Sequence, residues 1–324
     1  MQTPASTFVP VSKFRFGATV RDSEGQTGSL ASVVLDPTSY AVLAVGVRFG
    51  IFGRAAFAPI SAVAAATDAD VELRETRAEL AKSDKAPAGA LLDGGSTVTQ
   101  NGRRLGKLTQ ISFNADTRAL RHLVVERGLG AEFVVTAASV SQIAQDSVTL
   151  TAPANGAHPA FTPYRPDAEL REDVERALED YNRLRVDIAG ITISATDGVV
   201  WLRGHVSSEL NRRLASDLTS EIKGIGELHN ELVADPDLAA RISAALARDP
   251  RTAEERIGVY PVLGVVRLRG VVRTPAAREA AEQIARGIHT DGDVDNDLRV
   301  DPNANVLPVM SSVTNTEDAV PGGR

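Results

Sequence analysis

The chain has 324 residues, a net charge of −7 and no cysteine. Without thiols, a disulfide framework, a thiolate metal site and a cysteine nucleophile are all excluded. The charge is uneven, because residues 1–152 carry +1 and residues 153–324 carry −8. This balance disfavours nucleic acid as a partner, since its binders normally present a basic surface. The length allows roughly two to four domains, and the single Trp implies aliphatic cores.

The sequence predicts no membrane-spanning segment. No apolar run approaches the ~18 residues that such a helix needs. The first residues also lack the charged and apolar regions of a secretory signal. We therefore expect a cytoplasmic protein, with peripheral attachment at the inner face of the membrane as a further option.

The N-terminal half contains a repeat of short strands. Gly17 to Val20 reappears as Gly95 to Val98, at an offset of 78 residues. Each segment is rich in Val, Leu, Ile and Thr and is bounded by turn residues, and Asn101-Gly102 is a strong hairpin signal. Between the copies, Arg74 to Lys85 is predicted to be a short charged helix that ends before Pro87. The expected segments are an N-terminal tail at 1–11, β modules at 12–74 and 89–152, and a helical linker at 75–88.

The C-terminal half contains a different repeat, at an offset of 66 residues. Gly198 to Gly204 reappears as Gly264 to Gly270. Apolar residues at i, i+4 and i+8 predict a helix before each copy of this strand. Ser207-Ser208, Asp235-Pro236 and Thr274-Pro275 are predicted to begin helices. Each copy, 167–235 and 236–301, is thus expected to run helix, strand, strand, helix, strand, after a Pro-rich linker at 153–166 and before a disordered tail at 302–324.

Both repeats carry glycine at matched positions, where we expect turns or close backbone approach. These glycines are Gly17, Gly28, Gly95, Gly106, Gly198, Gly204, Gly224, Gly264 and Gly270.

The first repeat resembles the PRC-barrel, on the Gly-x-x-Val opening, the step to Gly28 or Gly106 and the strand that ends at Asp36 or Asn114. The second repeat resembles tandem BON domains, on the Gly198–Gly204 strand with its copy and the closing Asn-acidic-Leu segments. The resemblance implies a multidomain α+β protein with two small PRC-like β-barrels followed by two αββαβ BON-like domains. It also implies contact with phospholipid surfaces or envelope proteins, often in stress physiology, and no catalysis.

One face of the predicted BON strands is a candidate interaction face. Alternation in a strand places Val199, Trp201 and Arg203 on one face, and it places Arg267 and Arg269 on the matching face of the second copy. A position that holds Trp in one copy and Arg in the other is not expected in a deep core. The face is expected either to pack on a neighbouring domain or to contact a partner or a membrane interface.

A second candidate is a weak cation site in the acidic run Asp291, Asp293, Asp295 and Asp297. Carboxylates at alternate positions suit a hard cation such as Ca²⁺. However, the glycine and the final bidentate carboxylate of a calcium loop are missing, and the repeat makes this run a strand with its carboxylates in solvent. We therefore expect no cofactor, with weak cation binding as the alternative.

These observations predict a non-enzymatic stress-related or envelope-related adaptor that binds a phospholipid surface or a protein partner. The sequence has no GxSxG, P-loop, GxGxxG or HExxH motif. Two alternatives stay open: an RNA- or ribosome-associated factor, by analogy with one PRC-barrel lineage, and a cation-responsive sensor.

Overall fold

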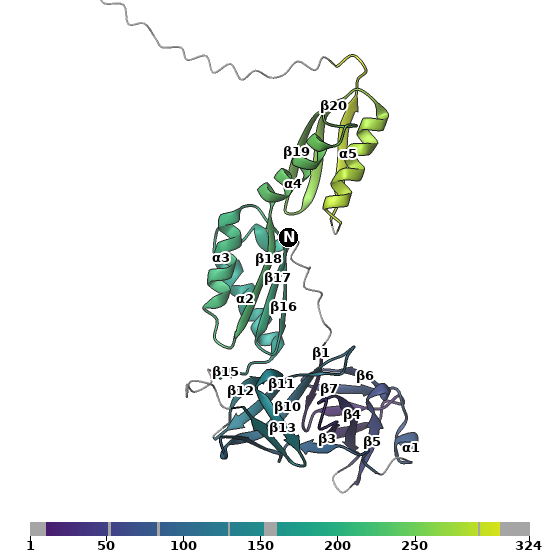
Figure 1. Ribbon diagram of the computed structural model, residues 1–324, viewed down its shortest axis with the longest axis vertical. Helices are drawn as coiled ribbons and strands as arrows, with labels where there is room; N and C mark the ends of the chain where they lie inside the picture. Colours follow the sequence, from purple (N-terminus) through teal and green to yellow (C-terminus); the bar gives the residue numbers. More distant parts are fainter. Residues whose placement is uncertain are drawn as a thin grey trace, which may run out of the picture. The chain divides into compact units, whose positions relative to one another are not determined.

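A computed structural model describes residues 11–50, 53–82, 85–128, 130–151, 161–290 and 292–304. The described part is a mixed α+β structure that consists mostly of strands, with five α-helices (Figure 1). Its packing forms two compact units. The first unit comprises residues 1–185, 192–202 and 215–231, and the second comprises residues 186–191, 203–214 and 232–324. Of the tail predicted at 1–11, residues 1–10 lie outside the described residues, and Val11 belongs to a strand. Most of the Pro-rich linker, Asp291 and the tail from 305 onward also lie outside the described residues.

The predicted N-terminal repeat folds as two equivalent sets of strands. The first set is β1 (Val11–Arg15), β2 (Thr19–Arg21), β3 (Thr27–Leu35), β4 (Val42–Arg48), β5 (Ala55–Pro59), β6 (Val63–Ala66) and β7 (Asp70–Leu73). The second set is β8 (Ala90–Asp93), β9 (Thr97–Gln100), β10 (Arg103–Asn114), β11 (Leu120–Arg127), β12 (Ala131–Thr136), β13 (Val140–Ala144) and β14 (Ser147–Leu150). The hairpin between β9 and β10 turns at Asn101 and Gly102, whose φ values of 51° and 71° match the turn that the sequence predicts.

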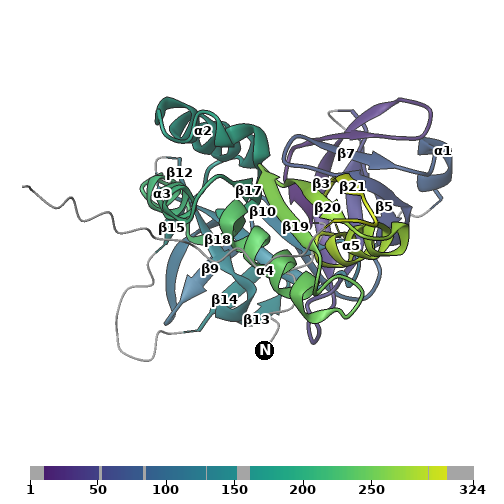
Figure 2. The ribbon, with the colours of Figure 1, turned by 90° about the horizontal axis from the view of Figure 1, so that it is seen from above.

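The two repeats exchange their first strands. β1 pairs with β10 of the second repeat, and β8 pairs with β3 of the first. Figure 2 shows the strands of the two repeats as neighbouring sheets. One hydrophobic core runs through both repeats, and within it the rings of Phe14 and Phe113 lie 5.7 Å apart. The β modules predicted at 12–74 and 89–152 therefore share one core, because each repeat completes its sheet with a strand of the other.

The closed barrels that the sequence predicts are not confirmed. Among the described strands, one sheet runs β5-β4-β3-β2-β7-β6 and the other runs β13-β14-β9-β10-β11-β12-β15, where β15 is Thr162–Pro163. Both orders run from one edge strand to another. The resemblance to a PRC-barrel therefore stays a prediction.

The helix between the β repeats is shorter than predicted. Among the described residues of the charged segment 74–85, the helix is the single turn α1 (Arg77–Leu80). Thr76 caps it, and the Thr76 and Glu79 side chains form a reciprocal capping box. Leu80 is its one buried residue, and one apolar anchor does not stabilise further turns.

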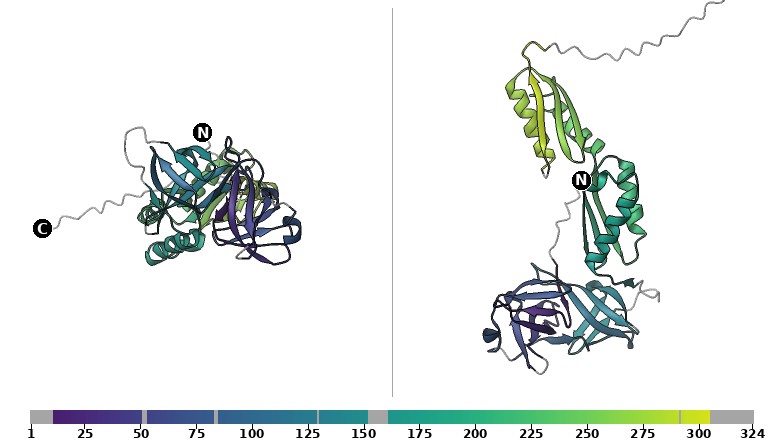
Figure 3. Two further views of the ribbon diagram at one scale, coloured as in Figure 1. Left: turned by 90° about the horizontal axis from the view of Figure 1, so that it is seen from below. Right: turned by 180° about the vertical axis from the view of Figure 1, so that it is seen from behind.

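The C-terminal repeat has the predicted order of elements twice. The first copy is α2 (Asp167–Asp180), β16 (Ile191–Thr196), β17 (Val199–Val206), α3 (Glu209–Ser220) and β18 (Glu227–Ala234). The second copy is α4 (Asp235–Arg248), β19 (Arg256–Val262), β20 (Val265–Val272), α5 (Pro275–Ile288) and β21 (Val294–Val300). In the second copy, α4 and α5 lie on one side of the sheet (Figure 3). The predicted helix faces are buried in both copies.

All three predicted helix starts are confirmed, although the residue that caps α4 is not the predicted Asp235. The Thr274 side chain caps α5 by accepting from the Ala277 amide, with Pro275 in the first turn. The Ser208 hydroxyl accepts from the Asn211 amide at the start of α3. Asp235, however, lies inside α4 after the N-cap Ala234. Its carboxylate instead accepts from the amides of Leu263 (2.7 Å) and Gly264 (3.1 Å) in the β19–β20 turn.

Close backbone approach explains two of the matched glycines. A Cβ atom at Gly106 would lie 2.1 Å from the Glu126 carbonyl oxygen, and one at Gly270 would lie 2.0 Å from the Arg256 carbonyl oxygen. Gly270 also has a φ of 137°, which L side chains rarely adopt. These glycines allow close approach of neighbouring strands, β10 to β11 at Gly106 and β20 to β19 at Gly270.

We predict that Phe14→Ala lowers the free energy of unfolding by about 3–5 kcal/mol, since it leaves a cavity at a fully buried position. Because the core is shared, both β repeats should lose stability in one transition. Denaturant unfolding followed by circular dichroism measures this, with the exposed Arg21→Ala as the control. Two separate unfolding transitions of the strands, of which the substitution shifts the midpoint of only one, would contradict a shared core.

Candidate functional site

The predicted interaction face of the first αββαβ repeat carries a stacked pair. The Trp201 and His229 rings lie 5.4 Å apart with an angle of 10° between their planes. Val200 and Leu202, on the other side of the strand, are fully buried. The alternation predicted for β17 is therefore confirmed at these positions. Val199 differs, since only 7% of it is exposed and it lines a cavity described below.

The predicted face of the second repeat brings two sets of candidate residues together. β20 pairs with β21 in parallel, which sets Arg267 beside Asp295 and Arg269 beside Asp297. The Arg267 guanidinium lies 3.4 Å from the Asp295 carboxylate and 3.6 Å from that of Asp297, which in turn lies 3.9 Å from Arg269. The carboxylates considered for a cation therefore have arginine partners. Asp293 is exposed, and within the described ranges no His, Asp and Glu side chains form a group of three suited to a metal ion.

The two repeats use the same cross-strand position differently. At the offset of 66 residues, Trp201 corresponds to Arg267 and His229 to Asp295. The first repeat has an aromatic stack there, and the second has an ion pair. The two repeats therefore share the same strand arrangement but carry different side chains on the equivalent sheet face.

The same face of the second repeat ends in an apolar patch that the sequence analysis missed. We call Tyr260, Val262 and Val265 the apolar patch; they are 55%, 66% and 40% exposed. Val262 pairs with Val265 and Tyr260 pairs with Arg267, so the three side chains share the face of the arginines. The sequence could have located these residues, because the alternation of side chains along the two strands of the predicted hairpin puts them on the same face as Arg267.

A buried ionic cluster lies at the other end of the chain, within the first unit. Lys13 of β1 forms ion pairs with Asp68 at 3.2 Å, with Asp197 at 3.0 Å and with Asp167. His122 lies 3.3 Å from Asp197 through Nδ1. The side chains of Lys13 and Asp197 are almost fully buried. Local sequence patterns do not mark this cluster, because its members lie up to 184 positions apart in the numbering.

The pKa values in this cluster reflect burial and the crowding of carboxylates. Burial raises the pKa of Asp167 to about 6, although the nearby Lys13 ammonium pulls it down. Burial also acts to raise the pKa of Asp197, but hydrogen bonding to His122 and attraction to Lys13 bring it to about 2. Burial acts to lower the pKa of Lys13, and the three carboxylates, led by Asp197, raise it above its ordinary value. The cluster thus holds charged Lys13 and Asp197 at neutral pH, while Asp167 titrates close to it.

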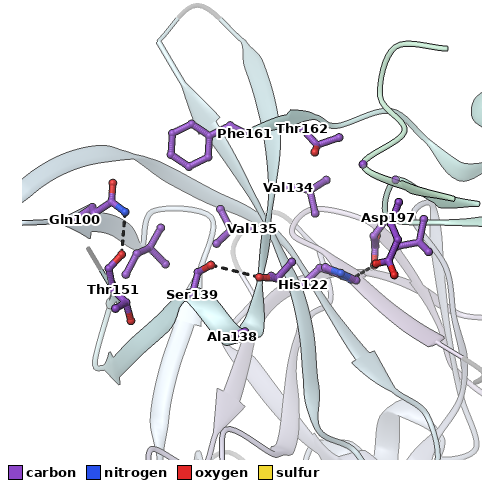
Figure 4. Close-up of a pocket in the computed structure, with 16 residues that line it drawn as sticks. Gln100, His122, Val134, Val135, Ala138, Ser139, Thr151, Phe161, Thr162 and Asp197 are labelled. Carbon is purple, nitrogen blue, oxygen red and sulfur yellow. Dashed lines mark hydrogen bonds and ion pairs between the residues drawn. The ribbon is translucent and has the colours of Figure 1, made fainter. Parts of the chain in front are cut away.

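A cavity of about 400 Å³ adjoins this cluster (Figure 4). His122 and Asp197 line one side, and Val134, Val135 and Phe161 line another. Hydroxyl and amide groups complete the wall: Gln100, Thr136, Ser139, Thr151 and Thr162. The cavity combines apolar walls with a few polar groups, which is typical of sites for small molecules.

The second unit also holds a pair of imidazoles, of which His289 is buried and His205 half-buried. The rings of His205 and His289 meet edge to face, 5.0 Å apart. Burial and the neighbouring His289 lower the pKa of His205. A Cβ atom at Gly264 would lie 2.4 Å from the His205 ring, so this glycine makes room for it.

Comparison with known proteins identifies the class of the C-terminal half. A family model of the BON domain matches residues 166–236 and 234–302. The C-terminal half therefore carries two BON domains, as the sequence predicts. No helix within the described ranges has the length and apolar character to cross a bilayer.

Individual relatives each match part of the chain. It is 25% identical over 146 residues to the osmotically-inducible protein Y of Escherichia coli (strain K12), in an alignment that covers 41% of this chain and 72% of that protein. Among solved structures, CdsD, a structural protein of the type III secretion system of Chlamydia trachomatis, matches at 14% identity and a TM-score of 0.33, over 41% of this chain and 61% of that chain. A structure of the CdsD C-terminal domain matches at 15% identity and a TM-score of 0.31, over 42% of this chain and 66% of that chain. The chain thus spans less than two thirds of either solved chain.

We predict that Asp167→Asn changes the pH dependence of stability between pH 4 and pH 7. With a folded pKa of about 6, above its ordinary value of 3.8, Asp167 binds its proton more tightly in the folded state. Its contribution to stability is therefore full below about pH 4 and is lost as the pH rises through 6. The free energy of unfolding of wild type minus that of the variant should fall by about 1–3 kcal/mol over this range. Denaturant titrations of the wild type and the variant at a series of pH values measure it. A flat difference for Asp167→Asn would contradict the buried position of Asp167.

We also predict flat calorimetric titrations of the whole chain with Ca²⁺ and with K⁺. Asp295 and Asp297 already pair with arginines, and a calcium site needs several free oxygen ligands. A saturable binding signal that the substitution Asp295→Asn abolishes would contradict this prediction and support a cation site.

Proposed function

We propose that this protein is a non-enzymatic adaptor of osmotic-stress or envelope physiology that contacts a phospholipid surface through its second BON domain. The apolar patch and its neighbouring arginines make the contact. In the same proposal, the strand-rich N-terminal half, which resembles PRC-barrels, docks a protein partner, and no cofactor takes part. The cytoplasmic location, peripheral to the membrane, stays a prediction.

The observation that carries the proposal is the exposure of the apolar patch at one end of an arginine-bearing sheet face. Tyr260, Val262 and Val265 are 55%, 66% and 40% exposed. Tyrosine is favoured at the interface between lipid and water, and burial of apolar surface favours insertion. Exposed large apolar groups clustered on one face of a domain mark an interaction site rather than a random surface.

The charges on this face suit an anionic headgroup layer. The cross-strand registers place Arg256 and Arg299 on the same face as Arg267 and Arg269. Asp295 and Asp297 lie beside Arg267 and Arg269, and Arg256 and Arg299 add further basic groups to this face. Each basic residue near an anionic bilayer contributes about 1 kcal/mol, and this attraction is local, so the acidic chain as a whole does not prevent it.

The relatives supply the physiological part of the proposal. The Escherichia coli protein that this chain resembles is named for its osmotic induction. The similarity covers 41% of this chain, and the BON model matches residues 166–236 and 234–302. The stress role therefore rests on the BON half, and the docking role of the N-terminal half is a separate part of the proposal.

We predict that the full chain co-sediments with vesicles of phosphatidylcholine and phosphatidylglycerol, and more weakly with phosphatidylcholine alone. Val262→Asp combined with Tyr260→Ser should weaken vesicle binding by about tenfold or more, because a charge replaces buried apolar surface. Val186→Asp is the matched control, since Val186 is 73% exposed and lies outside the patch. Lack of co-sedimentation, or equal binding by the double variant, would overturn lipid contact through this face and leave a protein as its partner.

A further inference from the structure

We infer that the cavity of the first unit binds a small organic ammonium ion that carries an apolar group. This inference concerns a ligand and a part of the chain that the proposed lipid contact does not involve. It rests on the shape of the cavity, on its charge and on the polarity of its hydrogen-bonding groups.

The size and walls of the cavity fit a small organic molecule better than a bare ion. Its volume is about 400 Å³, which lies within the range of small-molecule sites. Val134, Val135, Phe161 and Val199 give it apolar walls. A metal ion needs several converging oxygen or nitrogen ligands, and the described residues contain no group of three such side chains. The apolar walls instead offer a surface for an alkyl group.

The charge around the cavity is negative. Asp197 lines it directly, and the Glu227 carboxylate stands at its exposed edge. Behind Asp197, the carboxylates of Asp167 and Asp68 share the single ammonium of Lys13. His229 lies 2.9 Å from Glu227 through Nε2. Even with His122 and His229 both protonated, four carboxylates face three cations. Neither lysine nor arginine is among the described residues that line the cavity.

An excess of negative charge in a poorly hydrated place costs free energy, and a bound cation offsets it. The raised pKa of Asp167 has the same origin in part, since Asp197 adds to the effect of burial. An anionic ligand would increase the excess, and a neutral one would leave it uncompensated. The cavity therefore selects for a cation.

The hydrogen-bonding groups that line the cavity favour a ligand that donates hydrogen bonds. The Nδ1 atom of His122 faces the Asp197 carboxylate, so a neutral imidazole carries its proton there and keeps Nε2 as an acceptor. Glu227 and the hydroxyl groups of Thr136 and Thr162 also accept. The Gln100 amide already donates to the Thr151 carbonyl oxygen at 3.0 Å. An ammonium group supplies N–H donors to these acceptors while its alkyl part lies against the valines and Phe161.

Isothermal titration calorimetry of the full chain tests this with three probes of similar size: butylammonium, 1-butanol and butyrate, at matched ionic strength. We expect saturable binding of butylammonium, at least about tenfold tighter than butanol, and no binding of butyrate. No saturable binding of butylammonium, or equal binding of butyrate, would overturn the inference.

Variants locate the binding. Ala138 lines the cavity at an exposed position, so Ala138→Phe should fill the cavity without disturbing the core and abolish binding. Glu227→Gln should weaken butylammonium binding by about threefold and leave butanol unchanged, because the exposed carboxylate contributes only charge attraction. Glu175→Gln, an exposed change on α2 outside the cavity, is the matched control. Unchanged binding in both Ala138→Phe and Glu227→Gln would place the ligand elsewhere and overturn the inference, whatever the vesicle experiment shows.

Discussion

The pairing of β1 with β10 organises the first unit, because it carries Lys13 out of its own repeat. The register sets Lys13 beside Ser112 and Phe14 beside Ile111. From there, Phe14 enters the shared core and Lys13 reaches Asp167 and Asp197. The equivalent strand β8 makes the reciprocal pairing with β3. The shared core, the ionic cluster and the charged wall of the cavity all depend on this exchange.

The ionic cluster shows how a buried charge is retained. An isolated buried ammonium is costly, whereas one with several close carboxylates is stable. Gln110 extends the network, since its amide donates to Asp197 at 3.4 Å while its carbonyl oxygen accepts from the Tyr164 hydroxyl at 3.2 Å. Arg15 of β1 adds a bidentate contact to Glu132. These polar contacts fix the positions of the residues around one cavity, so its polar wall is organised before any ligand binds.

The two BON domains have the same order of elements but present different side chains on one face of the sheet. Trp201 on His229 and Arg267 on Asp295 occupy equivalent positions, and both pairs form across neighbouring strands. In the second domain, the ion pairs leave Tyr260, Val262 and Val265 as the apolar part of the face. Repetition preserves the pairing of the strands, while side chains on the uncovered face vary without cost to the core.

The sequence by itself determined the elements of the C-terminal half. Period, turn residues and helix starts such as Thr274-Pro275 are local signals, so the αββαβ order and the buried helix faces follow from neighbouring residues. Only the tertiary structure decided which strands pair, because the alternation in β1 and β8 is satisfied equally by a partner in either repeat. For the same reason His122, Lys13 and Asp197 carry no local mark of their association, and Asp235 resembles an ordinary N-cap until the turn at Leu263 meets it. Contacts between residues far apart in sequence depend on chain topology, which local patterns do not encode.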